Sequence, residues 1–234
     1  MNVWTLVVRA ATLGVAMATP AAAQIGHLPQ RSPYADLPYR QEATLFAGWY
    51  EAGTDAVGVA PKSGPMVGVR YELRLVGPAL LTSKFAFVSS QRDVIDPRRP
   101  ADQRLVEADA SWPLYMADVG IALNLTGQRS FHRLVPFING AIGVATDFKG
   151  DTDVGAWRFG TPFAFSLGGG IKWVPSGNFQ ARVDVGTQLY QIKYPNSYYT
   201  TASDGTSVLQ LSESRNDWTS NLGVSLGLSY LFFR

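Results

Sequence analysis

The chain has 234 residues, with 20 basic and 18 acidic side chains, a formal net charge of +2 and no cysteine. A balance this close to neutral argues against a nucleic-acid-binding protein. The lack of cysteine excludes a disulfide scaffold and a cysteine-ligated metal site. Stability must then come from an extensive hydrogen-bonded core or from a membrane, and we expect no cofactor.

The first 23 residues are predicted to be a signal peptide for secretion. Arg9 supplies positive charge, residues 13–18 form a short apolar run, and the three alanines at 21–23 fit a small-residue cleavage site. A transmembrane anchor is the alternative interpretation. The run is short for a spanning helix, however, and Pro20 interrupts it.

Residues 24–40 are predicted to form an N-terminal linker in the periplasm. Three prolines lie among polar residues in this stretch, which is typical of extended chain. Residues 41–234 are then expected to form one domain.

About eight segments of alternating apolar and polar residues make up this domain. Side chains alternate between the two faces of a strand, so each segment predicts a strand with one apolar face. Each is near the ten-residue length of a tilted transmembrane strand. The segments cover roughly residues 44–51, 66–75, 81–91, 114–125, 136–146, 163–174, 179–192 and 216–234.

The connections between these strands alternate in length. Long, polar ones follow strands one, three, five and seven, at residues 52–64, 92–111, 147–161 and 193–215. Short ones follow strands two, four and six, at residues 76–78, 126–134 and 175–178. This asymmetry is typical of a closed sheet with one end outside the cell and the other in the periplasm. We predict an all-β fold, an eight-stranded antiparallel up-and-down transmembrane β-barrel.

The charged residues indicate which face of the sheet points outward. Between the ends of the segments, no charged residue lies on an apolar face. Exposing Arg or Lys to lipid at the bilayer midplane costs about 2–4 kcal/mol, so a lipid-facing surface should exclude them. A soluble lipocalin-like barrel would instead place its apolar face inside. The polar residues predicted inside are Arg70, Glu72, Arg74, Lys84, Asp118, Asn124, Lys172, Arg182, Asp184 and Gln188.

Two interpretations of these inward groups remain open. One is a salt-bridged plug, because buried charges need partners. The other is a narrow pore lined by the same groups, with an excess of positive charge. Glycines on the same faces would make room for the long side chains. Aromatic residues near the segment ends predict girdles at the two membrane interfaces. They are Trp49, Tyr115, Trp173, Phe179, Trp218, Tyr230 and Phe232.

Residues 41–234, and in particular the ending Gly-Leu-Ser-Tyr-Leu-Phe at residues 227–232, resemble the small outer-membrane β-barrel family of the OmpA/OmpX type. The resemblance implies an outer-membrane location, with outer-membrane lipid and lipopolysaccharide as neighbours. It also implies that the assembly machinery reads the C-terminal strand. We expect a monomer, with no peptidoglycan-binding domain after the barrel.

Few residues suggest chemistry. Some members of the family are enzymes that modify lipid A with a histidine near the outer leaflet. The predicted topology places both His27 and His132 on the periplasmic side. Residues 96–99, with the sequence Asp-Pro-Arg-Arg, could contact lipopolysaccharide phosphates or form a solvated loop.

We therefore predict a non-enzymatic outer-membrane barrel with a structural or surface-contact role. The alternatives are a narrow porin-like channel, a lipid A-modifying enzyme and a soluble periplasmic lipid-binding barrel.

Overall fold

The computed structural model describes residues 32–175 and 177–232. The predicted signal peptide, residues 24–31 of the predicted linker with His27, residue 176 and residues 233–234 lie outside these ranges. Within it, no helix is long and apolar enough to cross a membrane. The strands are β1 (Tyr34–Asp36), β2 (Gln41–Glu51), β3 (Gly64–Val76), β4 (Ala79–Ile95), β5 (Leu105–Asn124), β6 (Arg129–Phe131), β7 (Leu134–Thr146), β8 (Phe163–Trp173), β9 (Phe179–Lys193) and β10 (Asn216–Phe232). The described residues also include two short 3₁₀ helices, η2 (Ala101–Gln103) and η3 (Asn196–Tyr199).

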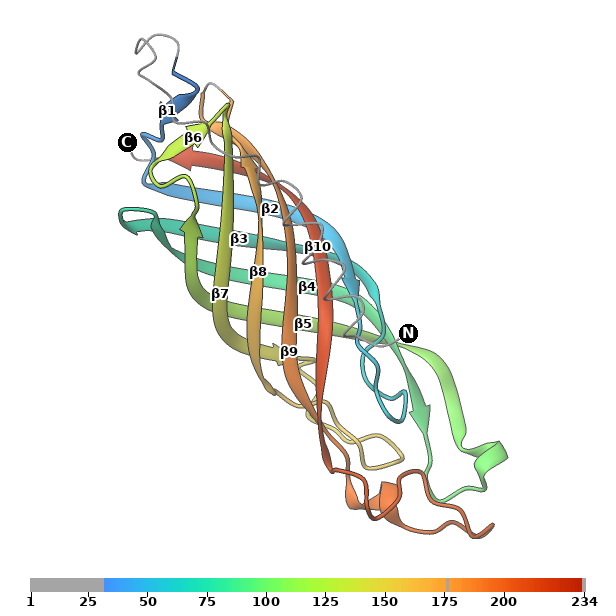
Figure 1. The fold of residues 1–234 in the computed structure, drawn as a ribbon. Coiled ribbons are helices and arrows are strands. Elements are labelled where there is room, and N and C mark those ends of the chain that lie inside the picture. The colour runs from blue at the N-terminus through green and yellow to red at the C-terminus, as the bar shows by residue number, and fades with distance from the viewer. Residues whose placement is uncertain (1–31, 176, 233–234) are drawn as a thin grey trace. The chain divides into compact units, whose positions relative to one another are not determined.

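Eight of these strands close into a ring (Figure 1). Each pairs antiparallel with its neighbours in the order β2, β3, β4, β5, β7, β8, β9 and β10. The ring closes where β10 pairs with β2, with Val224 opposite Trp49. The predicted eight-stranded antiparallel up-and-down barrel is confirmed, and most predicted strand ends lie within about three residues of the observed ones.

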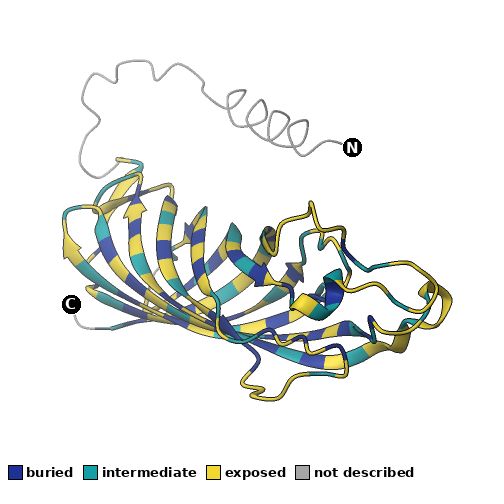
Figure 2. Ribbon diagram, turned by 90° about the horizontal axis from the view of Figure 1, so that it is seen from below, coloured by how far each residue is buried: buried dark blue, intermediate teal, exposed yellow. Residues whose placement is uncertain are grey.

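Burial alternates along most of each ring strand (Figure 2), because successive side chains point inward and outward; the first five residues of β5 are all exposed. In β10 the buried residues include Asn221, Ser225 and Ser229, whereas Leu222 and Leu226 are exposed. The apolar face is thus the outer one, as the distribution of charge predicts. The pattern is the reverse of a soluble barrel, in which the large apolar side chains fill the centre.

The hairpin of β4 and β5 extends further than its hydrophobic pattern indicates. Residues 92–111 were predicted to be a loop, but only 96–104 separate the two strands. The ladder continues because backbone hydrogen bonds do not depend on the polarity of the side chains. It passes irregularities between Arg92, Val94 and Ile95 before it ends.

The strand β1 lies outside the ring and pairs with β6, in the turn between β5 and β7. Just after β1, Leu37 and Tyr39 are buried in a small apolar cluster with Val135 and Leu231. Residues 34–39, which the sequence assigns to the linker, therefore pack against the end of the barrel where β10 finishes.

Candidate functional site

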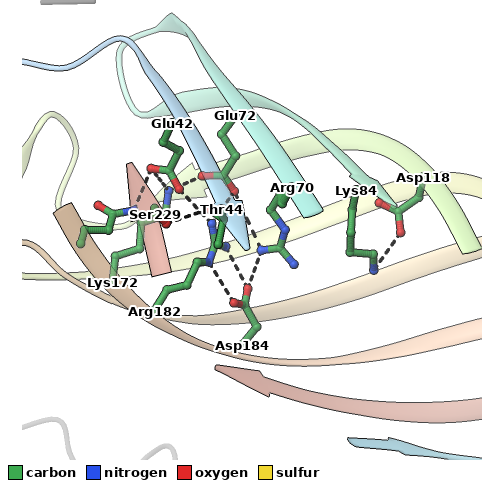
Figure 3. Close-up of polar contacts among 11 residues, drawn as sticks. Glu42, Thr44, Arg70, Glu72, Lys84, Asp118, Lys172, Arg182, Asp184 and Ser229 are labelled. Atoms are coloured by element: carbon green, nitrogen blue, oxygen red, sulfur yellow. Dashed lines mark hydrogen bonds and ion pairs between the residues drawn. The ribbon is translucent and has the colours of Figure 1, made fainter. Parts of the chain in front are cut away.

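Six ionisable side chains meet inside the barrel, near the end where β10 finishes (Figure 3). We call this set the charged layer. Its members are Glu42 from β2, Arg70 and Glu72 from β3, Lys172 from β8, and Arg182 and Asp184 from β9. All are at least about nine-tenths buried.

The sheet register explains why the charged layer spans the interior. Glu42 lies directly opposite Glu72 in the β2–β3 ladder, and Lys172 lies opposite Arg182 in the β8–β9 ladder. Like charges in such positions repel one another. The acidic pair and the basic pair face each other across the interior, so each offsets the repulsion within the other.

The contacts of the charged layer form one connected network. Lys172 Nζ lies 2.9 Å from Glu42 Oε2 and also contacts Glu72. Arg182 Nη1 contacts Glu42 Oε1 at 3.0 Å and Glu72 Oε1 at 3.1 Å. Arg182 also binds Asp184 through Nε and Nη2, both at 2.9 Å, and Arg70 Nη1 reaches Asp184 Oδ1 at 2.6 Å. The three positive charges of the layer therefore equal its three negative charges in number.

Neutral side chains complete this layer. Gln180 Nε2 donates to Glu42 Oε2 at 2.9 Å, and Tyr39 donates to Gln180 Oε1 at 3.4 Å. The hydroxyls of Thr44 and Ser229 lie 2.7 Å apart beside it. None of these neutral partners belongs to the set of inward residues predicted from the sequence. Glu42 is also missing from that set, because the first strand was predicted to begin at residue 44. Extending the alternation two residues back would have placed Glu42 on the inner face.

The other predicted inward residues lie apart from this network. Lys84 Nζ forms a separate ion pair with Asp118 at 2.8 Å, and Ser166 donates to the same carboxylate at 3.2 Å. Arg74 lies over the ring of Tyr39, 5.4 Å from its centre. Asn124 is buried and Gln188 is half-buried, and neither joins the charged layer.

An apolar layer fills the interior on the loop side, which the sequence analysis did not predict. The expected inner face was small and polar throughout. The inward residues here are instead Phe46, Tyr50, Met66, Val88, Leu114, Met116, Tyr190 and Ile192. The hydroxyls of Tyr50 and Tyr190 meet at 2.7 Å. The signal was available, because these residues alternate with the outward apolar ones and make both faces hydrophobic near the loops.

The long loops fold over the apolar layer as a loop cap, centred on Arg92. The guanidinium of this fully buried residue is held between the rings of Trp112 and Trp157, 4.2 and 4.3 Å from their centres. Its Nη2 contacts Asp153 Oδ2 at 2.5 Å. Val59, Phe159, Tyr194, Tyr198 and Leu209 from the loops join the same apolar cluster. The interior is therefore covered at this end by packed side chains.

Hydrogen bonds shift the pKa values of two loop residues. Lys62 donates hydrogen bonds to Asp109 at 2.7 Å and to Asp93 at 2.6 Å. Both bonds raise the pKa of its ammonium group, and the bond to Asp109 has the larger effect. The Ala101 N–H and both Thr206 donors bind Asp204 and hold its pKa at about 2. The hydrogen bond between Ala101 and Asp204 joins the tip of the β4–β5 hairpin to the loop between β9 and β10.

The two arginines of residues 96–99 contact their own aspartate. Asp96 Oδ1 lies 3.3 Å from Arg98 Nε, and Asp96 Oδ2 lies 3.5 Å from Arg99 Nε. Both arginine side chains are more than half exposed, at 73% and 53%.

His132 lies in the turn at the opposite end of the barrel, edge-on to Phe131. No group of metal-ligating side chains occurs within the described ranges.

The predicted girdle residues all point outward. Trp49, Tyr115 and Trp218 lie toward the loop side of their strands, whereas Trp173, Phe179, Tyr230 and Phe232 lie toward the other end. Trp49, Trp173, Phe179, Trp218 and Tyr230 are each about half exposed. The aromatic rings thus border the exposed apolar surface at both of its edges.

Neither a family model nor a curated protein matches the chain. Solved structures of outer-membrane proteins do match it. Neisserial surface protein A is 13% identical, with 86% of this chain and 98% of that chain covered and a TM-score of 0.46. AlkL is 12% identical, with coverages of 90% and 98% and a TM-score of 0.44. The outer membrane protein Ail of Yersinia pestis is 14% identical, with coverages of 82% and 99% and a TM-score of 0.34.

Proposed function

We propose that this protein is a non-enzymatic β-barrel integrated into the outer membrane, closed to solutes, and that its loops contact molecules at the cell surface. The observation that carries the proposal is the outer surface of the barrel. Among the described residues of the ring strands, the outward charged ones are Glu51, Asp93, Glu107, Asp109 and Lys193. All lie at or beyond the loop-side ends, where a strand has left the hydrocarbon.

The spacing of the aromatic girdles fits a bilayer. Trp218 and Tyr230 lie twelve residues apart on β10. At about 3.4 Å per residue and a tilt of roughly 40°, they are separated by about 30 Å along the barrel axis. Aromatic girdles are expected to flank an apolar band about 25 Å tall. We therefore propose that outer-membrane lipid surrounds the apolar band of the barrel.

The interior favours the plug over the channel. The charged layer and the apolar layer follow one another along the interior of the barrel, and the loop cap covers the apolar layer. About eight strands leave an interior that side chains can fill. Because the ions of the charged layer are balanced and paired, none is free to attract a permeating ion. The location of His132 in a turn at the end opposite the loop cap likewise disfavours chemistry at the outer leaflet.

The loops supply the proposed contact surface. The β4–β5 hairpin and the loop between β9 and β10 are joined through Asp204, and Arg104 binds Thr206 in the same contact. Two exposed arginines, Arg98 and Arg99, lie at the hairpin tip, and lipopolysaccharide phosphate is the proposed partner for them. The side chain of Leu211 is 86% exposed on the neighbouring loop.

Fractionation with planar-bilayer recording tests the proposal. We expect the mature protein in the outer-membrane fraction, extracted only by detergent and migrating faster in gels before heating than after. Reconstituted protein should give no conductance steps at any voltage. A protein that stays soluble without detergent contradicts membrane integration, whereas reproducible steps contradict a closed interior.

A further inference from the structure

A cavity of about 40 Å³ lies inside the barrel, between the charged layer and the apolar layer. Arg70 and Asp184 of the charged layer line it together with Phe46 and Met66 of the apolar layer. Lys84, Ser166, Gln188 and Ser225 also contribute to its wall. The wall of the cavity thus has both polar and apolar parts.

A row of three glycines creates the cavity. Gly168 of β8 lies opposite Gly186 of β9, and Gly186 lies opposite Gly223 of β10. All three occupy inward positions and line the cavity. Three neighbouring strands therefore contribute no side chain at one level of the barrel, which leaves this part of the interior open.

Two buried polar atoms on the cavity wall have no hydrogen-bond partner within the described part of the chain. They are Arg70 Nε, a donor, and Gln188 Oε1, an acceptor. A buried polar atom without a hydrogen-bond partner destabilises the folded state, and a charged group does so more strongly. Both atoms belong to residues that line the same cavity, so one bound species could serve both.

We infer that this cavity is a binding site for a small cluster of water molecules, which hydrates the guanidinium of Arg70 and the amide of Gln188. A water needs about 10–15 Å³ of such volume, so the cavity of about 40 Å³ has room for about three. Buried waters typically satisfy otherwise unpaired polar groups. The paired ions on the wall leave no net charge for an anion to neutralise, because Arg70 binds Asp184 and Lys84 binds Asp118.

Gly223 is the position at which the inference can be tested by substitution. A Cβ there would meet only Met66 Cε at 3.6 Å and the Gly186 carbonyl at 3.9 Å, which are ordinary contacts. At Gly168 it would lie 2.7 Å from the Val185 carbonyl, so that position cannot accept one. Gly223→Ala should place a methyl group in the cavity and displace water without straining the backbone.

Gly140 is a matched control. It also lies within a ring strand, but it faces outward, and a Cβ there would meet only Leu167 Cδ1 at 4.0 Å. Gly140→Ala thus reproduces the loss of unfolded-state freedom that accompanies any Gly→Ala change, without touching the cavity. Gly223→Ser adds a hydroxyl that can replace one water.

The experiment combines NMR with urea unfolding on the full chain in detergent micelles. We expect water cross-peaks at the Arg70 Nε–H and the Gly223 amide, lost in Gly223→Ala and retained in Gly140→Ala. The urea midpoint of Gly223→Ala should lie below that of Gly140→Ala, and Gly223→Ser should recover part of the difference. Absence of the cross-peaks from the unsubstituted protein overturns the inference, even if a variant fails to fold. A Gly223→Ala midpoint above that of Gly140→Ala, as for a dry void filled by a methyl, also overturns it.

Discussion

At the scale of single residues, Glu42 decides whether the charged layer is balanced. Its two oxygens accept hydrogen bonds from Lys172, Arg182 and Gln180, so it connects the two cations that come from β8 and β9. Buried ion pairs gain little over a hydrophobic replacement, but removing one partner leaves a charge that nothing compensates. The contribution of Glu42 is therefore best seen by neutralising it alone.

Glu42→Gln should lower the free energy of unfolding by about 3–5 kcal/mol, because the layer then carries one uncompensated positive charge. Urea titration of the folded protein in micelles measures this. Glu107→Gln, an exposed acid beyond the rim, should change stability by less than about 0.5 kcal/mol. Adding Lys172→Met to Glu42→Gln restores neutrality and should recover part of the loss. Equal effects of Glu42→Gln and Glu107→Gln would contradict the role assigned to Glu42.

Asp204 gives the loop contact a pH dependence with a defined sign. Its pKa is depressed from the ordinary 3.8 to about 2, first by the Ala101 N–H and then by the two Thr206 donors. A depressed pKa means that the contact is fully present above about pH 4 and is lost as the pH falls through 2. The amide shift of Ala101 should titrate with a midpoint near 2 and stop titrating in Asp204→Asn. A midpoint near 4 would show that the contact is absent in solution.

At the scale of elements, the β4–β5 hairpin links the barrel to the loop cap. It continues beyond the rim and places Arg92 and Trp112 where the loop between β7 and β8 can pack on them. That loop contributes Asp153 and Trp157, which complete the surroundings of the guanidinium. The cap thus depends on one cation shared by two elements far apart in the sequence.

Arg92→Met should open the cap and leave the ring intact. A hydrogen bond to a charged group contributes about 1.5–3 kcal/mol, so local opening should increase roughly 10- to 100-fold. Limited trypsin digestion measures this at the exposed Lys149 and Arg158, both in the loop that covers Arg92. Arg129→Met, which removes an exposed ion pair with Asp36 at the other end, should leave cleavage unchanged. Equal cleavage of the two variants would contradict the account of the cap.

At the scale of the whole molecule, the sequence predicts the ring and its orientation because period-two alternation and the exclusion of charge act over every strand. It does not predict which inward residues meet, because pairs such as Glu42 with Lys172 join strands that are not neighbours in the ring. Nor does hydropathy distinguish an apolar residue on the outer surface of the barrel from one in the apolar layer. Phe46 and Leu45 are both large apolar residues, and only closure of the ring shows that Phe46 is buried inside the barrel whereas Leu45 is exposed on its outer surface.

The proposed apolar band also predicts how the cost of a charge varies with depth along β10. Val224 lies midway between Trp218 and Tyr230 and faces outward, so Val224→Arg should cost about 2–4 kcal/mol. Ser220→Arg, on the same face near the loop-side girdle, should cost only about 0–1 kcal/mol. Unfolding from lipid vesicles measures both. Equal costs would mean that no hydrocarbon surrounds this face.

Spin labelling along β10 tests the central claim most directly, because the chain has no native cysteine to interfere. Single cysteines placed at Leu222, Val224, Leu226 and Leu228 in vesicle-reconstituted protein can carry the label. We predict that all four labels are relaxed strongly by oxygen, which partitions into lipid, and weakly by a water-soluble nickel complex. Strong relaxation by the nickel complex at these positions would contradict a lipid-facing outer surface, and with it the proposed membrane barrel.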